Sequence, residues 1–347
     1  MIFTEGFGSW NLNQTAPIMT KWDGGTGGHT EFEFYYGYTK IPGRFSKTCI
    51  ALNYDNSLYY APFKDVGSDA HYIIGMAIKK ISTSSTSRQL FGTLNGSSRV
   101  LSMVLGVDSK IVVKVGTTDM TTINYPIKTN RWNYIEVEHK LHASTGILKV
   151  WINEVLVYSF TGNTLGSTSF SNITRFDIWN TVGGSGAAIA IDDLYYLTSN
   201  GSTLPWGDTH IKEFQGTSDI SNSGWTLSAG TDLFDVINKP FNAAGTPTLT
   251  ASALNSKFLV DCSDVVGGTS AIVKAVAFNI RAIKSDAGAK NLSGLFKIGA
   301  TEYLGTDTPL TASDDLIYDP FLLSPATGIG WTKAEVEAMS FGAKVTL

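Results

Sequence analysis

The sequence is poor in charge. Only 16% of its 347 residues are Asp, Glu, Lys or Arg, whereas about a quarter is usual in soluble domains. The formal net charge is −4, and no stretch gathers Lys and Arg into a basic cluster. Because binding to nucleic acid depends on clustered cations that neutralise phosphates, we expect no nucleic-acid partner.

Cysteine is scarce as well, and long apolar runs are missing. The two cysteines, Cys49 and Cys262, lie far apart in apolar surroundings, so we predict buried thiols and no disulfide framework. No apolar run approaches the roughly 20 residues that a membrane helix needs. Residues 1–5 lack the basic and apolar regions of a signal peptide. We therefore expect neither membrane insertion nor a cleaved export signal.

Helical periodicity is absent before residue 330, and alternating strands take its place. Residues 131–160 show this best, because they read as three short strands joined by two turns. In the first strand, apolar side chains alternate with Glu136 and Glu138 on the opposite face, with His139 among the apolar ones. Similar strands recur about every ten to twelve residues, which is typical of an all-β sandwich. With 43% hydrophobic residues, the chain can bury a sizeable core.

The same stretch resembles a known family. Trp132 precedes an alternating strand, a polar turn, a second strand that ends at Asn153 and its return, and Ile191-Asp192-Asp193-Leu194 follows. This pattern resembles the concanavalin A-like jelly rolls, the laminin-G-like branch above all, over about residues 1–198. The resemblance implies an N-terminal jelly-roll sandwich.

Several laminin-G-like relatives bind calcium at a rim through carboxylate and carbonyl oxygens. By this resemblance, Asp192 and Asp193 are the metal-ligand candidates, and calcium is the metal to expect if there is one. Adjacent strand residues point to opposite faces, so only one of the two could be a ligand. The alternative is that one Asp caps a turn or pairs with Arg175 or a backbone amide.

A change in composition divides the chain. Residues 199–222 are rich in Gly, Ser, Asn and Pro, and we predict a linker there between domains of residues 1–198 and 223–347. The second domain reads as a smaller β-sandwich with one short helix. Thr332 and Glu335 form a capping box at the start of that helix.

The C-terminal part carries a second resemblance. Residues 275–297, Tyr303-Leu-Gly, Asp319-Pro and the run from Pro325 to Val336 resemble the C-terminal module of tailed-bacteriophage structural proteins, over about residues 205–347. In that family the module follows a jelly-roll domain. The resemblance implies a virion component on the exterior of the particle.

Aromatic residues near the N-terminus allow two interpretations. Residues 31–38 alternate and favour a core strand, and residues 57–62 are ambiguous in the same way. The alternative is a platform on which sugar rings stack, because aromatic rings offer flat apolar faces with polar tips. The carbohydrate-binding candidates are then Tyr35, Tyr36, Tyr38, Tyr59 and Tyr60.

The sequence gives little sign of catalysis. The Glu-x-Asp-x-x-Glu strand of concanavalin A-like β-glucanases is absent, and the five histidines have no metal-ligand spacing. Glu136 and Glu138 share a strand face about 7 Å apart, which we interpret as a solvated outer face. We expect no enzymatic activity.

These observations lead to a structural hypothesis. We expect a non-enzymatic protein on the exterior of a tailed-phage virion, either a capsid decoration or a tail-tip or baseplate component, with or without weak glycan binding. Its expected partners are other virion proteins, further copies of itself and a host surface glycan. The main alternative is a tail fibre or spike adhesin that binds host carbohydrate, and a polysaccharide-degrading enzyme is a third.

Overall fold

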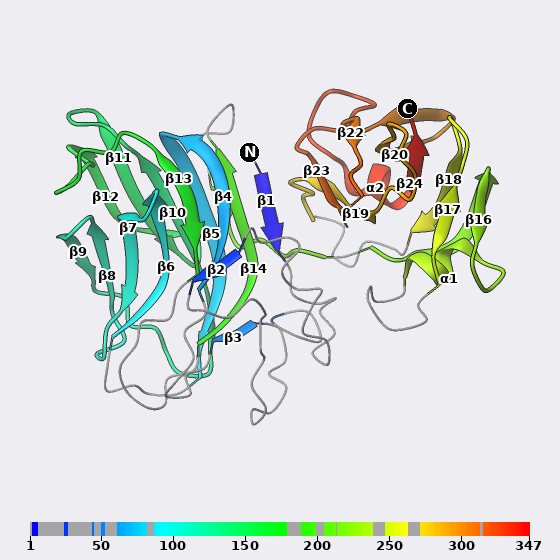
Figure 1. Ribbon diagram of the computed structural model, residues 1–347. Coiled ribbons are helices and arrows are strands. Elements are labelled where there is room, and N and C mark those ends of the chain that lie inside the picture. Colours follow the sequence, from blue (N-terminus) through cyan, green and yellow to red (C-terminus); the bar gives the residue numbers. More distant parts are fainter. Residues whose placement is uncertain are drawn as a thin grey trace. The chain divides into compact units, whose positions relative to one another are not determined.

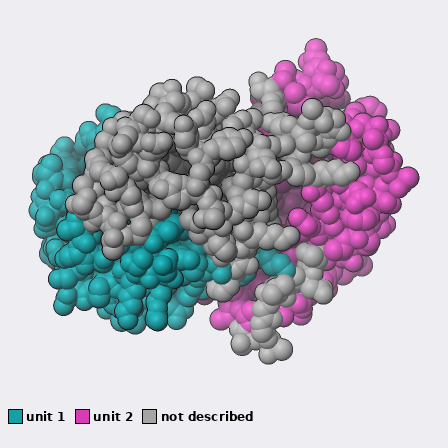
Figure 2. Space-filling view, turned by 90° about the horizontal axis from the view of Figure 1, so that it is seen from below, with its two compact units in different colours: residues 1–212 teal, residues 213–347 magenta. Residues whose placement is uncertain are grey.

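The chain divides into two compact units, residues 1–212 and residues 213–347, which Figure 2 shows in teal and magenta. The computed structural model describes residues 2–5, 24–26, 44, 50–52, 61–81, 87–178, 189–198, 205–212, 214–238, 247–262, 271–312 and 315–347. Almost all regular structure in these ranges is β-strand, as predicted (Figure 1).

The first unit contains two antiparallel sheets. The first sheet has the order β1-β14-β5-β10-β11-β12, and β3 also pairs with β14. Neighbouring strands such as β14 and β5 come from distant parts of the chain, which is the crossing pattern of a jelly roll. The strands are β1 (Ile2–Glu5), β3 (Ile50–Leu52), β5 (His71–Lys80), β10 (Trp132–Lys140), β11 (Gly146–Ile152), β12 (Val155–Gly162) and β14 (Ile189–Thr198).

The second sheet of this unit has the order β2-β4-β13-β6-β7-β8-β9. Here too the neighbours are distant in the chain, because β13 lies between β4 and β6. The strands are β2 (Gly24–Thr26), β4 (Ala61–Asp69), β6 (Arg88–Asn95), β7 (Ser98–Leu105), β8 (Ile111–Val115), β9 (Thr118–Ile123) and β13 (Ile173–Asp177).

The meander predicted over residues 131–160 is confirmed as β10, β11 and β12. Val137 pairs with Val150 across the first turn, and Val150 pairs with Tyr158 across the second. The apolar side chains of β10 and β11 point between the two sheets, where they meet residues such as Phe91 and Met103 of the second sheet. The core of the jelly roll therefore lies between the sheets, as the alternation requires.

A chain of polar contacts crosses this core. His139 is wholly buried. The Tyr72 hydroxyl lies 2.7 Å from Nδ1 of His139 and 2.9 Å from the Thr93 hydroxyl of the second sheet. Nε2 of His139 lies 3.1 Å from the Thr164 carbonyl oxygen. Since that carbonyl can only accept, Nε2 carries the proton and Nδ1 accepts from Tyr72. The imidazole is thus held neutral.

The second unit is built on a sheet with the order β15-β18-β24-β20-β21, with β22 pairing β20, and on two smaller pairs, β16-β17 and β19-β23. The strands are β15 (Gly216–Ser223), β16 (Trp225–Leu227), β17 (Leu249–Ala251), β18 (Lys257–Cys262), β19 (Val276–Ala282), β20 (Asn291–Ile298), β21 (Thr301–Leu304), β22 (Thr308–Pro309), β23 (Asp315–Phe321) and β24 (Met339–Val345).

Two short helices accompany these strands in the described residues. The predicted helix is α2 (Lys333–Glu337), and its capping box forms as expected, with the Glu335 amide donating to the Thr332 hydroxyl over 3.1 Å. The other, α1 (Leu233–Ile237), was not predicted, because its single buried turn is too short to show periodicity. Among the described residues, no helix is long and apolar enough to cross a membrane.

The predicted linker has a different extent. Residues 205–212 belong to the first unit, and β15 begins at Gly216 as an edge strand of the second. Polar composition suggested a linker, yet every residue of β15 after Gly216 is exposed, and an exposed edge strand can be as polar as a linker. The boundary between the units falls after Lys212, inside the range that we predicted.

Candidate functional site

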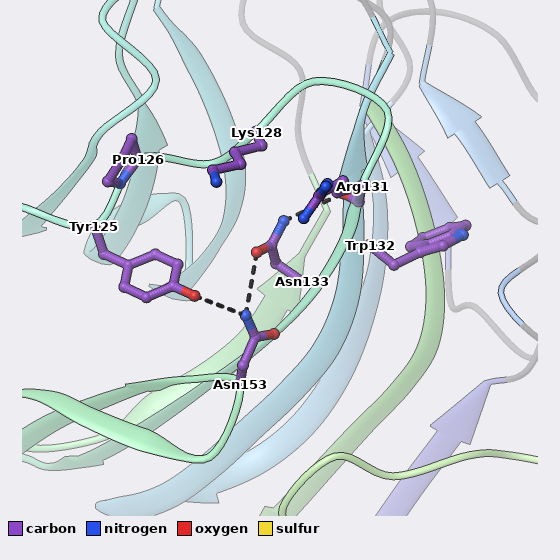
Figure 3. A pocket seen from close by; sticks show the side chains of 7 residues that line it. All are labelled: Tyr125, Pro126, Lys128, Arg131, Trp132, Asn133 and Asn153. Carbon is purple, nitrogen blue, oxygen red and sulfur yellow. Dashed lines mark hydrogen bonds between the residues drawn. The ribbon is translucent and has the colours of Figure 1, made fainter.

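A pocket forms where the segment between β9 and β10 passes the turn between β11 and β12 (Figure 3). Asn153 and Glu154 make this turn with positive φ angles of 50° and 66°, a geometry that Asn tolerates well. The turn is fixed to β10 from both sides. The Asn153 amide donates to the Tyr134 carbonyl over 2.8 Å, and the Tyr134 amide donates to Oδ1 of Asn153 over 2.8 Å.

The Asn153 side chain organises the floor of the pocket. Its Nδ2 donates to the Tyr125 hydroxyl over 3.0 Å and to Oδ1 of Asn133 over 3.2 Å. Asn133 is buried, and its own Nδ2 donates to the Arg131 carbonyl over 3.2 Å. Figure 3 shows these side chains linked together, with Lys128 and Arg131 on the loop that arches over them. The floor is therefore pre-organised by three side chains that hydrogen-bond to one another in a chain, Tyr125, Asn153 and Asn133.

The pocket has a volume of about 390 Å³, which is within the range of small-molecule sites. None of the described residues that line it is a carboxylate. The ring of Trp132 points away from the floor (Figure 3) and packs on the outer face of the first sheet. The lining residues are Tyr125, Pro126, Lys128, Arg131, Trp132, Asn133 and Asn153.

The outer face of the first sheet corrects one expectation. We predicted that Glu136 and Glu138 face solvent, but they are only 2% and 3% exposed. The cover comes in part from residues 205–212, which we call the strap. The Gly207 amide donates to Oε1 of Glu136 over 2.8 Å, and the Tyr195 hydroxyl donates to the same oxygen. Burial raises the pKa of Glu136, and these hydrogen bonds offset only part of the rise.

Glu138 is held in a different way. His71 contacts one carboxylate oxygen at 3.0 Å and Lys149 donates to the other over 3.1 Å. Burial alone would raise the pKa of Glu138, but these contacts outweigh it and lower the pKa. Both oxygens of Glu138 and one oxygen of Glu136 are thus engaged internally, so Glu136 and Glu138 do not form the open pair of carboxylates that glycoside hydrolysis requires.

Four backbone amides of the strap donate hydrogen bonds to side-chain oxygens of the first unit and fix the strap to the sheet. In addition, the Trp206 ring packs on the Tyr195 ring with centroids 4.7 Å apart. Because peptide N–H groups need acceptors when buried, side-chain oxygens that project from the sheet can dock a segment without regular structure. The four bonds run from the Trp206 amide to Tyr195 (3.0 Å), from Gly207 to Glu136 (2.8 Å), from Asp208 to Glu154 (3.2 Å) and from Ile211 to Asp193 (2.9 Å).

Asp192 and Asp193, the metal candidates, are engaged by Arg44 and by the strap. The pairing of β14 with β5 is irregular between Asp192 and Tyr195, and Asp193, which lies in this irregularity, has a positive φ of 49°. Asp192 accepts the Arg44 amide over 2.8 Å, and the Arg44 guanidinium lies 3.7 Å from Asp193. Burial, and then the nearby Asp192, raise the pKa of Asp193 to about 7. In the described residues, no group of three His, Cys, Asp or Glu residues could hold a metal ion. The observed contacts are of the kind that the alternative interpretation proposed, pairing with an arginine and with backbone amides. The arginine is Arg44 and not Arg175.

The aromatic candidates for sugar stacking, Tyr35, Tyr36, Tyr38, Tyr59 and Tyr60, lie outside the described residues. The pocket residues were not predicted as a site. The available signal was the Asn153-Glu154 turn, together with two cations, Lys128 and Arg131, in a loop of a chain that is otherwise poor in charge.

Comparisons with known proteins find distant structural likenesses. No protein-family model and no curated protein sequence matches this chain. The solved structure of alginate lyase Aly36B matches 57% of this chain and 97% of its own, with 12% identity and a TM-score of 0.43. A cellulose-induced protein matches 57% of this chain and 97% of its own, with 11% identity and a TM-score of 0.40. The PL-14 alginate lyase from Aplysia kurodai matches 45% and 85%, with 12% identity and a TM-score of 0.35.

These likenesses correct the structural hypothesis. The expected structural role in a phage virion is contradicted, because the similar structures are described as alginate lyases, sialidases and a cellulose-induced protein, and none of those named is a virion component. At these identities and TM-scores, the likeness gives no argument about activity. The function must therefore be argued from the pocket.

Proposed function

We propose that the first unit binds carbohydrate in the pocket between the β9–β10 segment and the β11–β12 turn. The observation that carries this proposal is the combination of an aromatic ring with two fixed side-chain amides around a hollow of about 390 Å³. The same contacts that fix the amides leave hydrogen-bonding groups available in the pocket.

Tyr125 supplies the aromatic part. Its ring packs partly against the jelly-roll core, and its hydroxyl is held by Asn153. A ring fixed in this way can lie against the apolar C–H face of a sugar without losing further side-chain freedom. Because its hydroxyl oxygen accepts from Asn153, the hydroxyl proton remains available to a ligand.

Asn133 and Asn153 supply the polar part. Sugar hydroxyls are both donors and acceptors, and amides can serve either role. The Asn133 side chain uses one amide hydrogen on the Arg131 carbonyl, which leaves its second hydrogen for a ligand. Since these groups are already ordered, binding costs little conformational entropy.

Titration of the full-length chain with immobilised oligosaccharides tests the proposal. Tyr125→Ala removes the ring, and we expect binding at least about tenfold weaker. Tyr125→Phe keeps the ring and removes only the hydroxyl, so its loss should be smaller. Tyr158→Ala is the matched control, because Tyr158 is also partly buried against the core but does not line the pocket.

Two results would overturn the proposal. One is the absence of binding to any member of a broad panel of neutral and acidic oligosaccharides. The other is binding that Tyr125→Ala leaves unchanged while Tyr158→Ala reduces it, which would place the ligand elsewhere on the first unit.

A further inference from the structure

We infer that the ligand of this pocket carries an anionic group, a carboxylate or sulfate on the sugar, which Lys128 and Arg131 recognise. The inference rests on the proposed function and narrows it to acidic saccharides.

The first observation is that both cations lack a counter-charge. Lys128 and Arg131 are exposed, and neither forms an ion pair or a side-chain hydrogen bond within the described residues. Several other cations of the first unit have carboxylate partners even though the chain is poor in charge. These pairs are Arg99–Asp177, Lys110–Asp108, Lys114–Asp119, Lys149–Glu138 and Arg175–Asp65.

The nearby carboxylates are directed elsewhere. Glu154 follows Asn153 in the turn, but one of its oxygens accepts the amide of Asp208 in the strap. Asp108 lies on the turn before β8 and is 3.7 Å from Lys110. Among the described residues no carboxylate lines the pocket, so the charged groups that these residues present to an entering anion are Lys128 and Arg131.

A third cation lies behind the same loop. Lys80 is 4% exposed, and its ammonium group donates to the Ser109 hydroxyl over 2.5 Å. The loop is tied to it, because the Asn130 amide donates to the Lys80 carbonyl over 2.7 Å and the Ile127 amide to the Ser109 carbonyl over 2.8 Å. A buried ammonium adds to the positive potential felt at the loop.

The balance of donors and acceptors points the same way. The amide oxygens of Asn133 and Asn153 each accept one hydrogen bond already. The donors of Lys128 and Arg131, the Tyr125 proton and one Asn133 hydrogen have no acceptor in the described residues. A donor-rich pocket prefers a ligand rich in acceptors, and a carboxylate or sulfate offers the most acceptor capacity per group. The planar guanidinium of Arg131 suits a bidentate contact.

The experiment compares matched ligand pairs on the full-length chain. The probes are oligogalacturonate, oligoalginate, sialyllactose and chondroitin sulfate fragments, each measured against its carboxyl-reduced or desulfated counterpart by calorimetry. We expect the acidic member of at least one pair to bind about tenfold tighter or more. Lys128→Gln and Arg131→Gln should each reduce that preference, and the double variant should abolish it. Lys140→Gln, at the far end of β10, is the control cation.

The outcomes separate the two proposals. Equal binding of acidic and neutral members, or a preference that survives the double variant, overturns the anionic ligand but leaves carbohydrate binding intact. Binding of inorganic sulfate or phosphate alone, with no oligosaccharide bound, shows an anion site and overturns the saccharide. No binding of any probe overturns both.

Discussion

The neutral state of His139 should make the stability of the first unit depend on pH in a way that one substitution removes. Burial lowers the pKa of His139 from 6.5 to about 4, and the hydrogen bond to the Thr164 carbonyl offsets only part of this effect. At pH values between these two, His139 binds a proton in the unfolded chain but stays neutral in the folded chain. Stability therefore rises with pH across this window.

The magnitude follows from the difference between the two pKa values. One pKa unit corresponds to about 1.4 kcal/mol, so the first unit should lose about 3 kcal/mol of stability as the pH falls from 7 to 4. His139→Gln removes the titration while keeping one donor and one acceptor for Tyr72 and Thr164. The variant should be less stable at pH 7, because the glutamine amide cannot place its donor and its acceptor where the two ring nitrogens lie. It should nevertheless lose less stability than the wild type as the pH falls.

The assay equilibrates the full-length chain in urea at a series of pH values. A hydrogen-exchange pulse at one fixed pH then reports the unfolded fraction through the peptide that contains β10. Other groups with altered pKa values, including Glu136, Asp193 and His210, are present in both proteins, so their effects cancel in the difference. Parallel pH profiles for wild type and His139→Gln would refute the reasoning.

Two further predictions concern the strap and the capping box. Trp206→Ala removes the ring that stacks on Tyr195, and this should cost about 2 kcal/mol of the free energy that docks the strap. Hydrogen exchange should therefore accelerate more in residues 205–212 than in β10. Equal acceleration in both segments would contradict strap docking. Thr332→Ala removes the hydroxyl that caps α2, so the second unit should lose about 1 kcal/mol in denaturant titration, while a change confined to the first unit would contradict this assignment.

The meander and the capped helix could be predicted because their signals are local. Alternation over residues 135–141 decides which side chains enter the core, and the Thr332–Glu335 pair lies within one turn. His139 fits the same alternation and lies inside, but its polar partners could not be read from it. Thr164 binds His139 directly and Thr93 is linked to it through Tyr72, and these residues come together only in the folded sandwich.

The outer face of the first sheet could not be predicted by the same logic. Period-two alternation places Glu136 opposite the core, and water was the default neighbour there. The actual neighbour, Gly207, lies 71 positions away in a stretch with no apolar pattern. Its docking depends on backbone amides, which every residue except proline possesses and which therefore leave no trace in composition. The pocket was missed for a related reason, since Tyr125 and Asn153 are 28 positions apart.

The strap and the pocket together explain how an acidic chain can present an unopposed positive site. Net charge describes the whole molecule, but the potential at a site depends on the charges near it and on their screening. In the first unit, Glu136, Glu154 and Asp193 accept backbone amides of the strap, so three carboxylates are committed to holding a segment in place. Lys128 and Arg131 lie on the loop between β9 and β10 and form no ion pair within the described residues. The distribution of charge, and not its sum, therefore favours an anionic ligand at the pocket.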